Sequence, residues 1–249
     1  MINKKVIIAF FIICLISAIG FKTLFSSIAI IPTRLFSSNC SQATYFFNTE
    51  KKLIALAIDN VPDNNHVFPN TTLGMLDVLA NYKAKATFFI NIDKAKEFPA
   101  LMISIVEQGH ELGNYLTNNK LSIGLGYRFK TKLAEADRFL SQFAAINWFR
   151  AERDRCSSNL NRVIKIYGYK IALGSVWSDD INVASSQSYN RYIKKNIRPG
   201  AIIVLHDSNN QSDRLGENTI AVLNQIIPQL QQQGYSFVTL SELDRRSHS

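Results

Sequence analysis

The sequence is poor in the residues that build disulfide frameworks and clustered metal sites. It has three cysteines and four histidines in 249 residues. Cys14, Cys40 and Cys156 do not show the paired spacing of a structural zinc site or of a redox dithiol. A disulfide-dense scaffold and a cysteine-based zinc module are therefore excluded, while a single bridge between Cys40 and Cys156 stays open.

Acidic residues are also scarce. The chain has 19 Asp and Glu against 28 Lys and Arg, which gives a formal net charge of +9. Such a balance favours an anionic partner, either a membrane surface, an acidic wall polymer or a nucleic acid. Nucleic-acid binding requires clustered basic residues with aromatic platforms, whereas the basic residues here are spread along the chain. We therefore expect no nucleic-acid partner and interpret the excess as a solvated basic surface.

The remaining composition is that of a globular protein. Hydrophobic residues make up 47% and aromatic residues 11% of the chain, which is enough for one α/β domain with a full core. We divide the chain into a leader at 1–22, a linker at 23–50, a folded domain at 51–243 and a tail at 244–249.

The leader combines positive charge with an apolar run. Lys4 and Lys5 precede an uncharged stretch from Val6 to Phe21. This stretch is somewhat shorter than the ~20 residues of a usual spanning helix, and it shows no evident small-residue cleavage site. We expect an apolar helix that anchors the protein in a membrane, with the domain extracellular or periplasmic. A cleaved export signal, which would give a secreted protein, and a buried helix are the alternatives.

Short apolar runs alternate with amphipathic stretches in the domain. The expected strands are 53–58, 86–90, 111–114, 148–150, 171–176, 202–205 and 236–239, and the expected helices are 72–82, 97–108, 128–143, 157–167, 186–196 and 219–233. This alternation implies a mainly parallel sheet with helices on its outer side. The predicted fold class is α/β, a distorted and incomplete (β/α)7 barrel preceded by the N-terminal apolar helix.

Polar and aromatic side chains directly follow the predicted strands. The carboxyl ends of parallel barrel strands converge on one rim, so these residues predict a functional site there. They are Asp59, Asn60, Asn114, Tyr115, Arg150, Trp177, Asp179, Asp180, His206 and Asp207.

Five motifs follow one another in the order of a known family. They are Ile-Ala-Leu-Ala-Ile-Asp-Asn-Val-Pro at 54–62, Ala-Thr-Phe-Phe-Ile at 86–90, Gly-His-Glu-Leu-Gly-Asn at 109–114, Trp-Phe-Arg at 148–150 and Ile-Ile-Val-Leu-His-Asp at 202–207. Over residues 50–243 the chain resembles the polysaccharide deacetylases, also called carbohydrate esterase family 4 or the NodB-homology domain. The resemblance implies a hydrolase of carbon–nitrogen bonds in N-acetylated polysaccharides or oligosaccharides, such as chitooligosaccharide or cell-wall glycan.

The resemblance also implies roles for individual residues. Asp59 matches the family's catalytic base, Arg150 matches the arginine that holds this base, and His206 matches the histidine that acts as the acid. Trp177 with Asp179 and Asp180 matches the motif in which an aromatic ring lines the sugar groove and an aspartate orients the acid. The alternative is that Trp177, Asp179 and Asp180 belong to a solvent-exposed turn after a strand.

The family's metal ligands are replaced in this chain. Asn60 stands where the family has its second aspartate, and Tyr115 and Asn119 stand where it has two histidines. Neutral amides and a phenol are poor ligands for a zinc-like ion, so we expect no cofactor unless a divalent metal finds a replacement site. Tyr115 could instead stack on a sugar ring. The residues considered for a replacement site are His66, His110, Glu152 and Asp154, of which His110 is interpreted as structural.

Two functions from different classes follow. The first is an N-deacetylase with an unusual or absent metal. The second is a catalytically inactive, glycan-binding pseudoenzyme that keeps the groove.

Overall fold

A curled parallel sheet forms the centre of the domain in the computed structural model. The structure describes residues 42–63, 69–116, 127–151, 158–177, 186–207 and 215–249. Over these residues the sheet has eight strands, with the order β5-β4-β3-β2-β1-β7-β6 and with β8 paired to β1. The strands are β1 (Leu53–Val61), β2 (Thr87–Asn91), β3 (Glu111–Leu116), β4 (Trp148–Ala151), β5 (Lys170–Ile171), β6 (Val176–Trp177), β7 (Ile202–His206) and β8 (Ser236–Val238).

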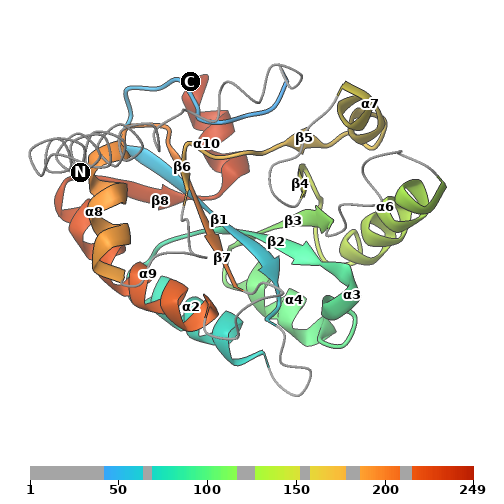
Figure 1. Ribbon diagram of the computed structural model, residues 1–249, viewed down its shortest axis with the longest axis horizontal. Helices are drawn as coiled ribbons and strands as arrows, with labels where there is room; N and C mark the ends of the chain where they lie inside the picture. The colour runs from blue at the N-terminus through green and yellow to red at the C-terminus, as the bar shows by residue number, and fades with distance from the viewer. Residues whose placement is uncertain (1–41, 64–68, 117–126, 152–157, 178–185, 208–214) are drawn as a thin grey trace, which may run out of the picture. The chain divides into compact units, whose positions relative to one another are not determined.

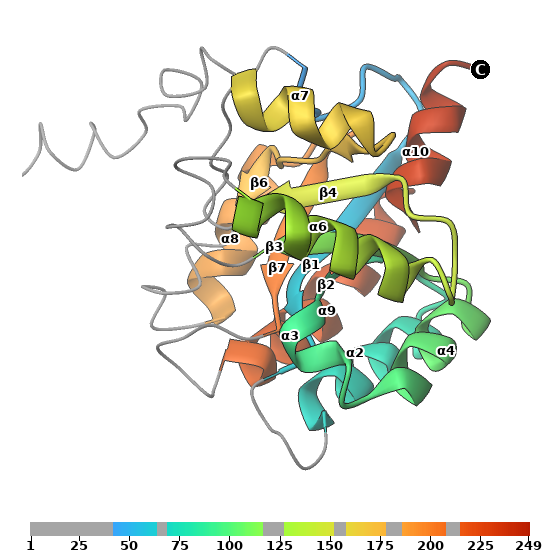
Figure 2. The same cartoon turned by 90° about the vertical axis from the view of Figure 1, so that its right-hand side faces the viewer.

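Helices separate the strands along the chain and surround the sheet, as Figures 1 and 2 show. They are α2 (Asn70–Asn81), α3 (Ile92–Ala95), α4 (Pro99–Glu107), α6 (Tyr127–Leu140), α7 (Ser158–Ile166), α8 (Ser186–Asn196), α9 (Leu215–Gln232) and α10 (Leu240–Ser247). Every pairing between these strands is parallel. The predicted α/β class and the incomplete barrel are confirmed.

One predicted strand is divided in the structure, and one predicted helix begins slightly later than expected. The strand expected at 171–176 is two short strands, β5 and β6, at opposite ends of the sheet. The connecting residues 172–175 are too few to span more than ~18 Å, so the two ends of the sheet must approach each other. The helix expected at 97–108 is α4, which begins at Pro99 because the first residue of a helix needs no N–H, and the short helix α3 before it was not predicted. Helix α10 was not predicted.

The seam between β5 and β6 is closed by a segment from before β1. Thr44 N–H donates to Ile171 O at 2.8 Å, and Leu173 N–H donates to Thr44 O at 2.8 Å. Phe47 is buried and meets the Trp148 ring edge-on at 6.1 Å between centroids. These residues fall within the range expected to be a linker, and they pack against the barrel. The leader at 1–22 lies outside the described residues, and none of the described helices is long and apolar enough to cross a membrane.

Successive residues of β1 face opposite sides of the sheet. Ile54, Leu56 and Ile58 pack in the core cluster formed with α2, α4 and α9, while Leu53, Ala55 and Ala57 pack in a second cluster on the inner face of the curl. A strand alternates its side chains with a period of two, so the next inner position of β1 belongs to Asp59.

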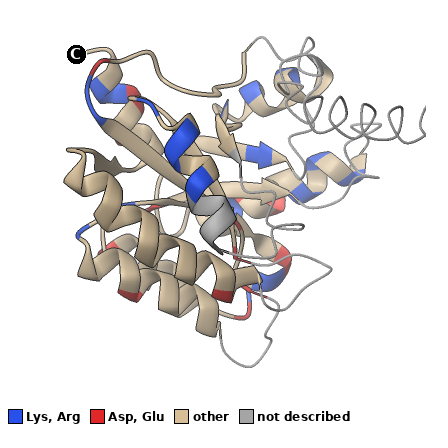
Figure 3. Ribbon diagram, turned by 60° about the vertical axis from the view of Figure 1, so that its left-hand side comes forward, with Lys and Arg blue, Asp and Glu red and all other residues tan. Residues whose placement is uncertain are grey.

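Positive charge is unevenly distributed over the helices. Helices α2, α4 and α9, which pack behind β1, contain no Lys or Arg, whereas α6, α7, α8 and α10 all do (Figure 3). Part of this charge is paired, since Lys132 of α6 contacts Asp93 and Arg246 of α10 contacts Glu242. The basic residues are thus spread over several helices, as the sequence predicted.

Candidate active site

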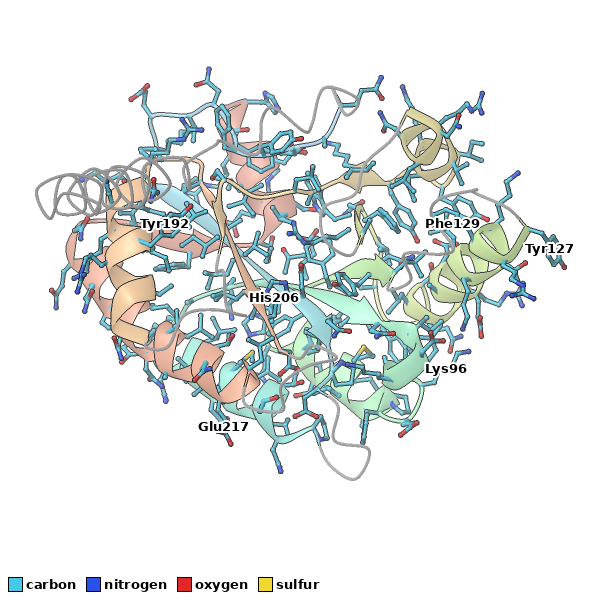
Figure 4. All side chains as sticks on the ribbon, in the orientation of Figure 1. Lys96, Tyr127, Phe129, Tyr192, His206 and Glu217 are labelled. Atoms are coloured by element: carbon cyan, nitrogen blue, oxygen red, sulfur yellow. The ribbon has the colours of Figure 1, made fainter. Side chains whose placement is uncertain are left out.

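Five polar side chains occupy inner-face positions at the carboxyl ends of neighbouring strands. They form one row across the sheet, with His206 on β7, Asp59 on β1, Asn91 on β2, Tyr115 on β3 and Arg150 on β4. Asp59 pairs in register with His206, and Tyr115 pairs with both Asn91 and Arg150. Figure 4 shows His206 near the centre of the sheet. Side chains of a strand alternate between the two faces of the sheet, so the strands that build the inner core also bring these five polar groups together on the inner face.

A bulge in β1 brings a second residue of this strand to the row. The ladder with β2 pairs Ile58 with Phe88 and then Val61 with Ile90, so β1 uses one more residue than β2. Asn60 lies in this bulge with φ 60°, in the left-handed region, which asparagine tolerates better than most residues. Its Oδ1 accepts a hydrogen bond from Asn91 Nδ2 at 2.9 Å. The bulge thus lets consecutive residues, Asp59 and Asn60, both reach the inner face.

The buried centre of the row is an ion pair. Arg150 Nε lies 2.5 Å from Asp59 Oδ2, and both side chains are almost completely buried. Arg150 Nη1 also donates to the carbonyls of Ala172 and Leu173, at 3.1 and 2.9 Å. These carbonyls belong to the segment that closes the barrel, so the closure fixes the guanidinium, and the guanidinium fixes Asp59.

His206 is the solvent-accessible member of the cluster. Its Nε2 lies 3.8 Å from Asp59 Oδ2, and its side chain is 26% exposed, against 3% for Asp59. The Thr219 hydroxyl donates to the His206 carbonyl at 2.7 Å, and Asp207 N–H donates to the Asp59 carbonyl at 3.0 Å. The backbone of the histidine is therefore held from both sides, while its side chain is partly exposed to solvent.

The electrostatic environment of Asp59 suits a proton acceptor. Burial raises the pKa of the Asp59 carboxyl above its ordinary value, and this effect exceeds the lowering by the charges of Arg150 and His206. Its second oxygen, Oδ1, is buried and has no hydrogen-bond partner within the described structure. Since buried polar atoms are nearly always satisfied, this oxygen is available to a water or to a polar group of a ligand.

The residues at the family's metal stations do not suit a zinc-like ion. Asn60 offers an amide oxygen that already accepts the hydrogen bond from Asn91, and Tyr115 offers a phenol. Asn119 lies outside the described residues. Within the described parts of the chain, no three His, Cys, Asp or Glu side chains form a group that could hold a metal ion. A divalent ion prefers charged or imidazole donors, so no chemical step is assigned to a metal here.

The other candidates divide into two groups. His110 precedes β3, at the opposite end of the sheet from the row, where its Nδ1 accepts from Ala86 N–H at 3.2 Å. Burial and the nearby Lys85 charge lower the pKa of His110 to about 4, so it is a neutral, structural histidine. Trp177 lies in β6, where its backbone pairs with Val204. The predicted groove residues Asp179 and Asp180, together with His66, Glu152, Asp154, Cys40 and Cys156, fall outside the described residues.

The sequence analysis missed several residues that support the site. Asn91 directly follows a predicted strand, so the rule that selected the other rim residues should have included it. Thr219 could not have been found in this way, because it lies inside a helix and acts through its hydroxyl on a distant carbonyl. Thr71 and Lys94 could not have been found either, because they also lie inside helices, where Thr71 contacts the Asp63 and Asp207 carboxyls and Lys94 donates to the Pro62 carbonyl.

Comparisons with known proteins agree with the geometry. The family model for polysaccharide deacetylase matches residues 47–171. A peptidoglycan-N-acetylglucosamine deacetylase of Bacillus cereus is 31% identical over 209 residues, covering 82% of this chain and 94% of its own length. The crystal structure of the Bc1960 peptidoglycan N-acetylglucosamine deacetylase has a TM-score of 0.71 at 25% identity and covers 80% of this chain and 91% of that one.

A further structural neighbour shares the fold. It is a mutant of BA3943, described as a carbohydrate esterase family 4 pseudoenzyme with restored enzymatic activity. Its TM-score is 0.68 at 22% identity, with coverage of 82% of this chain and 71% of that one, so the likeness concerns the fold. With its family-model match, its relative in Bacillus cereus and its row of rim residues, the chain belongs to the polysaccharide deacetylase family.

Proposed function

We propose that this protein hydrolyses the N-acetyl amide of a glycan, releasing acetate and leaving a free amine on the sugar. The observation that carries this proposal is the cluster of Asp59, Arg150 and His206, in which a buried carboxylate, its fixed guanidinium and an accessible imidazole lie in one row. The proposed substrate is an N-acetylated polysaccharide or oligosaccharide, because relatives are named as deacetylases of peptidoglycan N-acetylglucosamine.

The chemistry assigned to the chain's own residues is proton transfer. Asp59 takes a proton from a water molecule as that water attacks the acetyl carbon, and the raised pKa of its carboxyl strengthens it as a base. The tetrahedral intermediate then loses the amine, to which His206 donates a proton. Arg150 holds Asp59 in place throughout. The amide bond breaks, one water is consumed, and acetate and amine are formed.

A second candidate function rests on a different observation. The stations at Asn60 and Tyr115 carry neutral side chains, so the site lacks the donors with which the family polarises its substrate. A protein that keeps the groove without this chemistry would bind a glycan and leave it intact. The BA3943 neighbour, described as a pseudoenzyme, supports this alternative for a protein of the same fold.

Acetate release distinguishes the two functions. The purified protein is incubated with chitooligosaccharides and with peptidoglycan, and acetate is measured together with oligosaccharide binding by calorimetry. Deacetylation that is abolished in Asp59→Asn and in His206→Gln, but not in the surface variant His248→Gln, supports the hydrolase. Binding without acetate release supports the glycan-binding protein. Neither binding nor acetate release contradicts both.

The location of the protein is also proposed. Lys4 and Lys5 followed by the apolar run from Val6 to Phe21 support an anchored or exported domain that meets its glycan outside the cell. Fusing residues 1–50 to a reporter tests this proposal. A membrane-bound reporter supports the anchor, a trimmed and soluble reporter in the exterior fraction supports a cleaved signal, and a cytoplasmic reporter contradicts both.

A further inference from the structure

A second buried cluster lies directly behind the candidate active site. Asp207 follows His206 and, by the alternation of β7, points to the opposite side of the sheet, where it meets the first turn of α2. The Thr72 hydroxyl donates to Asp207 Oδ2, and the Thr71 hydroxyl contacts Asp207 Oδ1. The Asp207 residue is 1% exposed and Thr72 is fully buried. A second carboxyl, Asp63, also contacts the Thr71 hydroxyl, at 2.7 Å.

The number of protons in this cluster does not match the number of contacts. Three oxygen–oxygen contacts join the two carboxyls to the hydroxyls of Thr71 and Thr72, but two hydroxyls supply only two protons. The Thr71 hydroxyl can donate to one carboxyl only. It must accept a hydrogen bond from the other, and a carboxyl donates only when it is protonated. One of the two carboxyls is therefore a neutral acid.

The surroundings identify which carboxyl holds the proton. Asp63 Oδ2 also accepts Thr71 N–H at 3.0 Å, at the N-terminus of α2, where a negative charge is favoured. Asp207 lies deeper, and burial raises the pKa of its carboxyl to about 7, with a further rise from the charge of Asp63 and opposing effects of Thr71, Thr72 and Lys94. Asp63 is therefore the carboxylate and Asp207 the acid.

The charge of the cluster is balanced in this state. Lys94 of α3 interacts electrostatically with both carboxyls and donates to the Pro62 carbonyl at 3.3 Å. Burial lowers the pKa of Lys94 to about 8, so its ammonium is still charged at neutral pH and offsets the Asp63 carboxylate. Asp63 and Lys94 are the charged groups that act on Asp207 within the described structure. Helix α2 faces it with two hydroxyls, and α9 approaches its backbone with Gly216.

Hydrogen bonds connect this cluster to the row of polar residues at the candidate active site. The N–H of Asp207 holds the Asp59 carbonyl, and its side chain fastens the end of β7 to α2. A side chain at Gly216 would collide with Thr71 and with the Asp207 carbonyl, so α2, β7 and α9 meet here without spare room. Any shift of Asp207 is therefore passed to His206, the residue before it.

We propose that Asp207 is a positioning residue that acts as a neutral carboxylic acid, donating its proton to Thr71 and thereby holding His206 at the active site. The assignment of His206 as the group being positioned rests on the proposed function, whereas the protonation of Asp207 does not. Ionisation of Asp207 sets two carboxylates against the single proton of the Thr71 hydroxyl, and the end of β7 then keeps only the hydrogen bond from the Thr72 hydroxyl as its side-chain attachment to α2.

Isosteric variants test this inference on the full-length protein. Asp207→Asn imitates the neutral acid, because its amide donates to Thr71 and accepts from Thr72. The folded protein holds a proton on Asp207 that the unfolded chain has lost above its ordinary pKa of 3.8, so wild-type stability falls as pH rises from about 4 to about 7. We expect the melting temperature of Asp207→Asn to match that of wild type at pH 4, to exceed it progressively up to pH 7, and to stay above it at pH 8.

The matched variants distinguish the two carboxyls. We expect Asp63→Asn to melt below wild type at pH 6, and Thr71→Val to melt below wild type by an amount that is largest at pH 5 and shrinks toward pH 8, because valine removes the acceptor of the neutral acid's proton. Thr131→Val, which removes a hydroxyl bonded to Tyr127 O on the exposed side of α6, should leave the melting temperature unchanged. A buried carboxylic-acid band in the infrared spectrum at pH 6 should be present in wild type and in Asp63→Asn and absent in Asp207→Asn.

Each result decides the inference. Absence of the band from the wild-type protein, or its loss in Asp63→Asn alone, overturns the assignment even if every variant unfolds.

Acetate release by Asp207→Asn should persist to higher pH than in wild type, whereas Asp207→Ala should lose it and shift the His206 ring signals in NMR spectra. If the wild type releases no acetate, the proposed function fails, and the infrared and melting results still decide the protonation of Asp207. If Asp207→Ala releases acetate as wild type does and leaves the NMR signals of the His206 ring unchanged, the positioning role of Asp207 is contradicted.

Discussion

Two buried carboxyls on neighbouring strands are accommodated in opposite ways. Asp59 at the end of β1 faces the inside of the barrel and keeps its charge beside the guanidinium of Arg150. Asp207 at the end of β7 faces the helices and, by our inference, gives up its charge by binding a proton. A buried charge without a partner is very costly, so each carboxyl needs a counter-charge or a proton. In the functions proposed here, Asp59 would serve as a base and Asp207 as a positioning acid, because the partners of the two carboxyls differ.

The largest expected effect comes from removing the counter-charge on the inner face. Arg150→Met leaves the buried Asp59 carboxylate without its guanidinium, with only the His206 ring nearby, and removes the donors to the carbonyls of Ala172 and Leu173. We expect the free energy of unfolding to fall by about 3–5 kcal/mol, measured by urea denaturation at pH 7.

The double variant Asp59→Asn with Arg150→Met serves as its control. Removing both charges together should restore most of the lost stability, because no uncompensated charge then remains. A cost below about 1 kcal/mol for Arg150→Met alone would show that Asp59 is already neutral, and that the two carboxyls do not differ.

A buried base at the other end of the sheet extends the comparison. His110 stays neutral in the folded protein, with a pKa lowered from 6.5 to about 4. The unfolded chain therefore binds a proton between these pH values that the folded protein does not, and stability is full above pH 6.5 and is lost as pH falls toward 4. We expect a loss of roughly 3 kcal/mol across this window relative to His110→Gln, measured by denaturation at several pH values.

The contribution of Asp207 has the opposite sign in the same window, so wild-type stability alone does not separate the two groups. Repeating the measurement in the Asp207→Asn background isolates His110. Parallel pH profiles for His110→Gln and its parent would contradict a neutral, buried imidazole.

The inner face lacks the charged and imidazole donors of the family's metal site, and substitutions can supply them. The triple change Asn60→Asp, Tyr115→His and Asn119→His restores the family pattern, and it should create stoichiometric zinc binding and raise acetate release. We expect each substitution to cost about 1 kcal/mol of stability, since an aspartate still accepts from Asn91 and histidine is smaller than tyrosine. Elemental analysis after dialysis measures the zinc.

Asn60→Asp alone is the matched control and should bind zinc weakly, because one added carboxylate does not complete a three-ligand site. Stoichiometric zinc in the unmodified protein would falsify the conclusion that the present donors do not suit the ion. His66 or Glu152 would then have to enter the coordination shell, since His110 lies at the opposite end of the sheet.

The smallest effect is expected where solvent, rather than a partner, compensates the charge. Arg246 and Glu242 form a partly exposed pair one turn apart on α10, at 2.9 Å. Glu242→Gln should change the free energy of unfolding by less than about 0.5 kcal/mol, because water screens this pair. A cost close to that of Arg150→Met would mean that burial does not explain the difference between the pairs.

The sequence was most informative where local pattern and strand topology act together. Alternating runs predicted the parallel sheet, and the position of Asp59, Arg150 and His206 just after their strands predicted that they would meet. Both follow from short-range rules, because strand polarity fixes which end of each strand reaches the rim. The sequence was less informative about the strand at 171–176, which is divided because barrel closure, rather than local propensity, decides where its two halves pair.

The sequence by itself determined the family, the row of strand-end residues and the loss of charged donors at Asn60 and Tyr115, because these depend on residue type and on order along the chain. Only the tertiary structure decided the partners of the buried groups. It placed Asn91 against Asn60 through a bulge, closed the seam around Arg150, and brought Asp63, Thr71 and Lys94 together behind His206. Burial and hydrogen-bond geometry set the charge of a carboxyl, and both arise from residues far apart in the sequence that meet only in the folded chain.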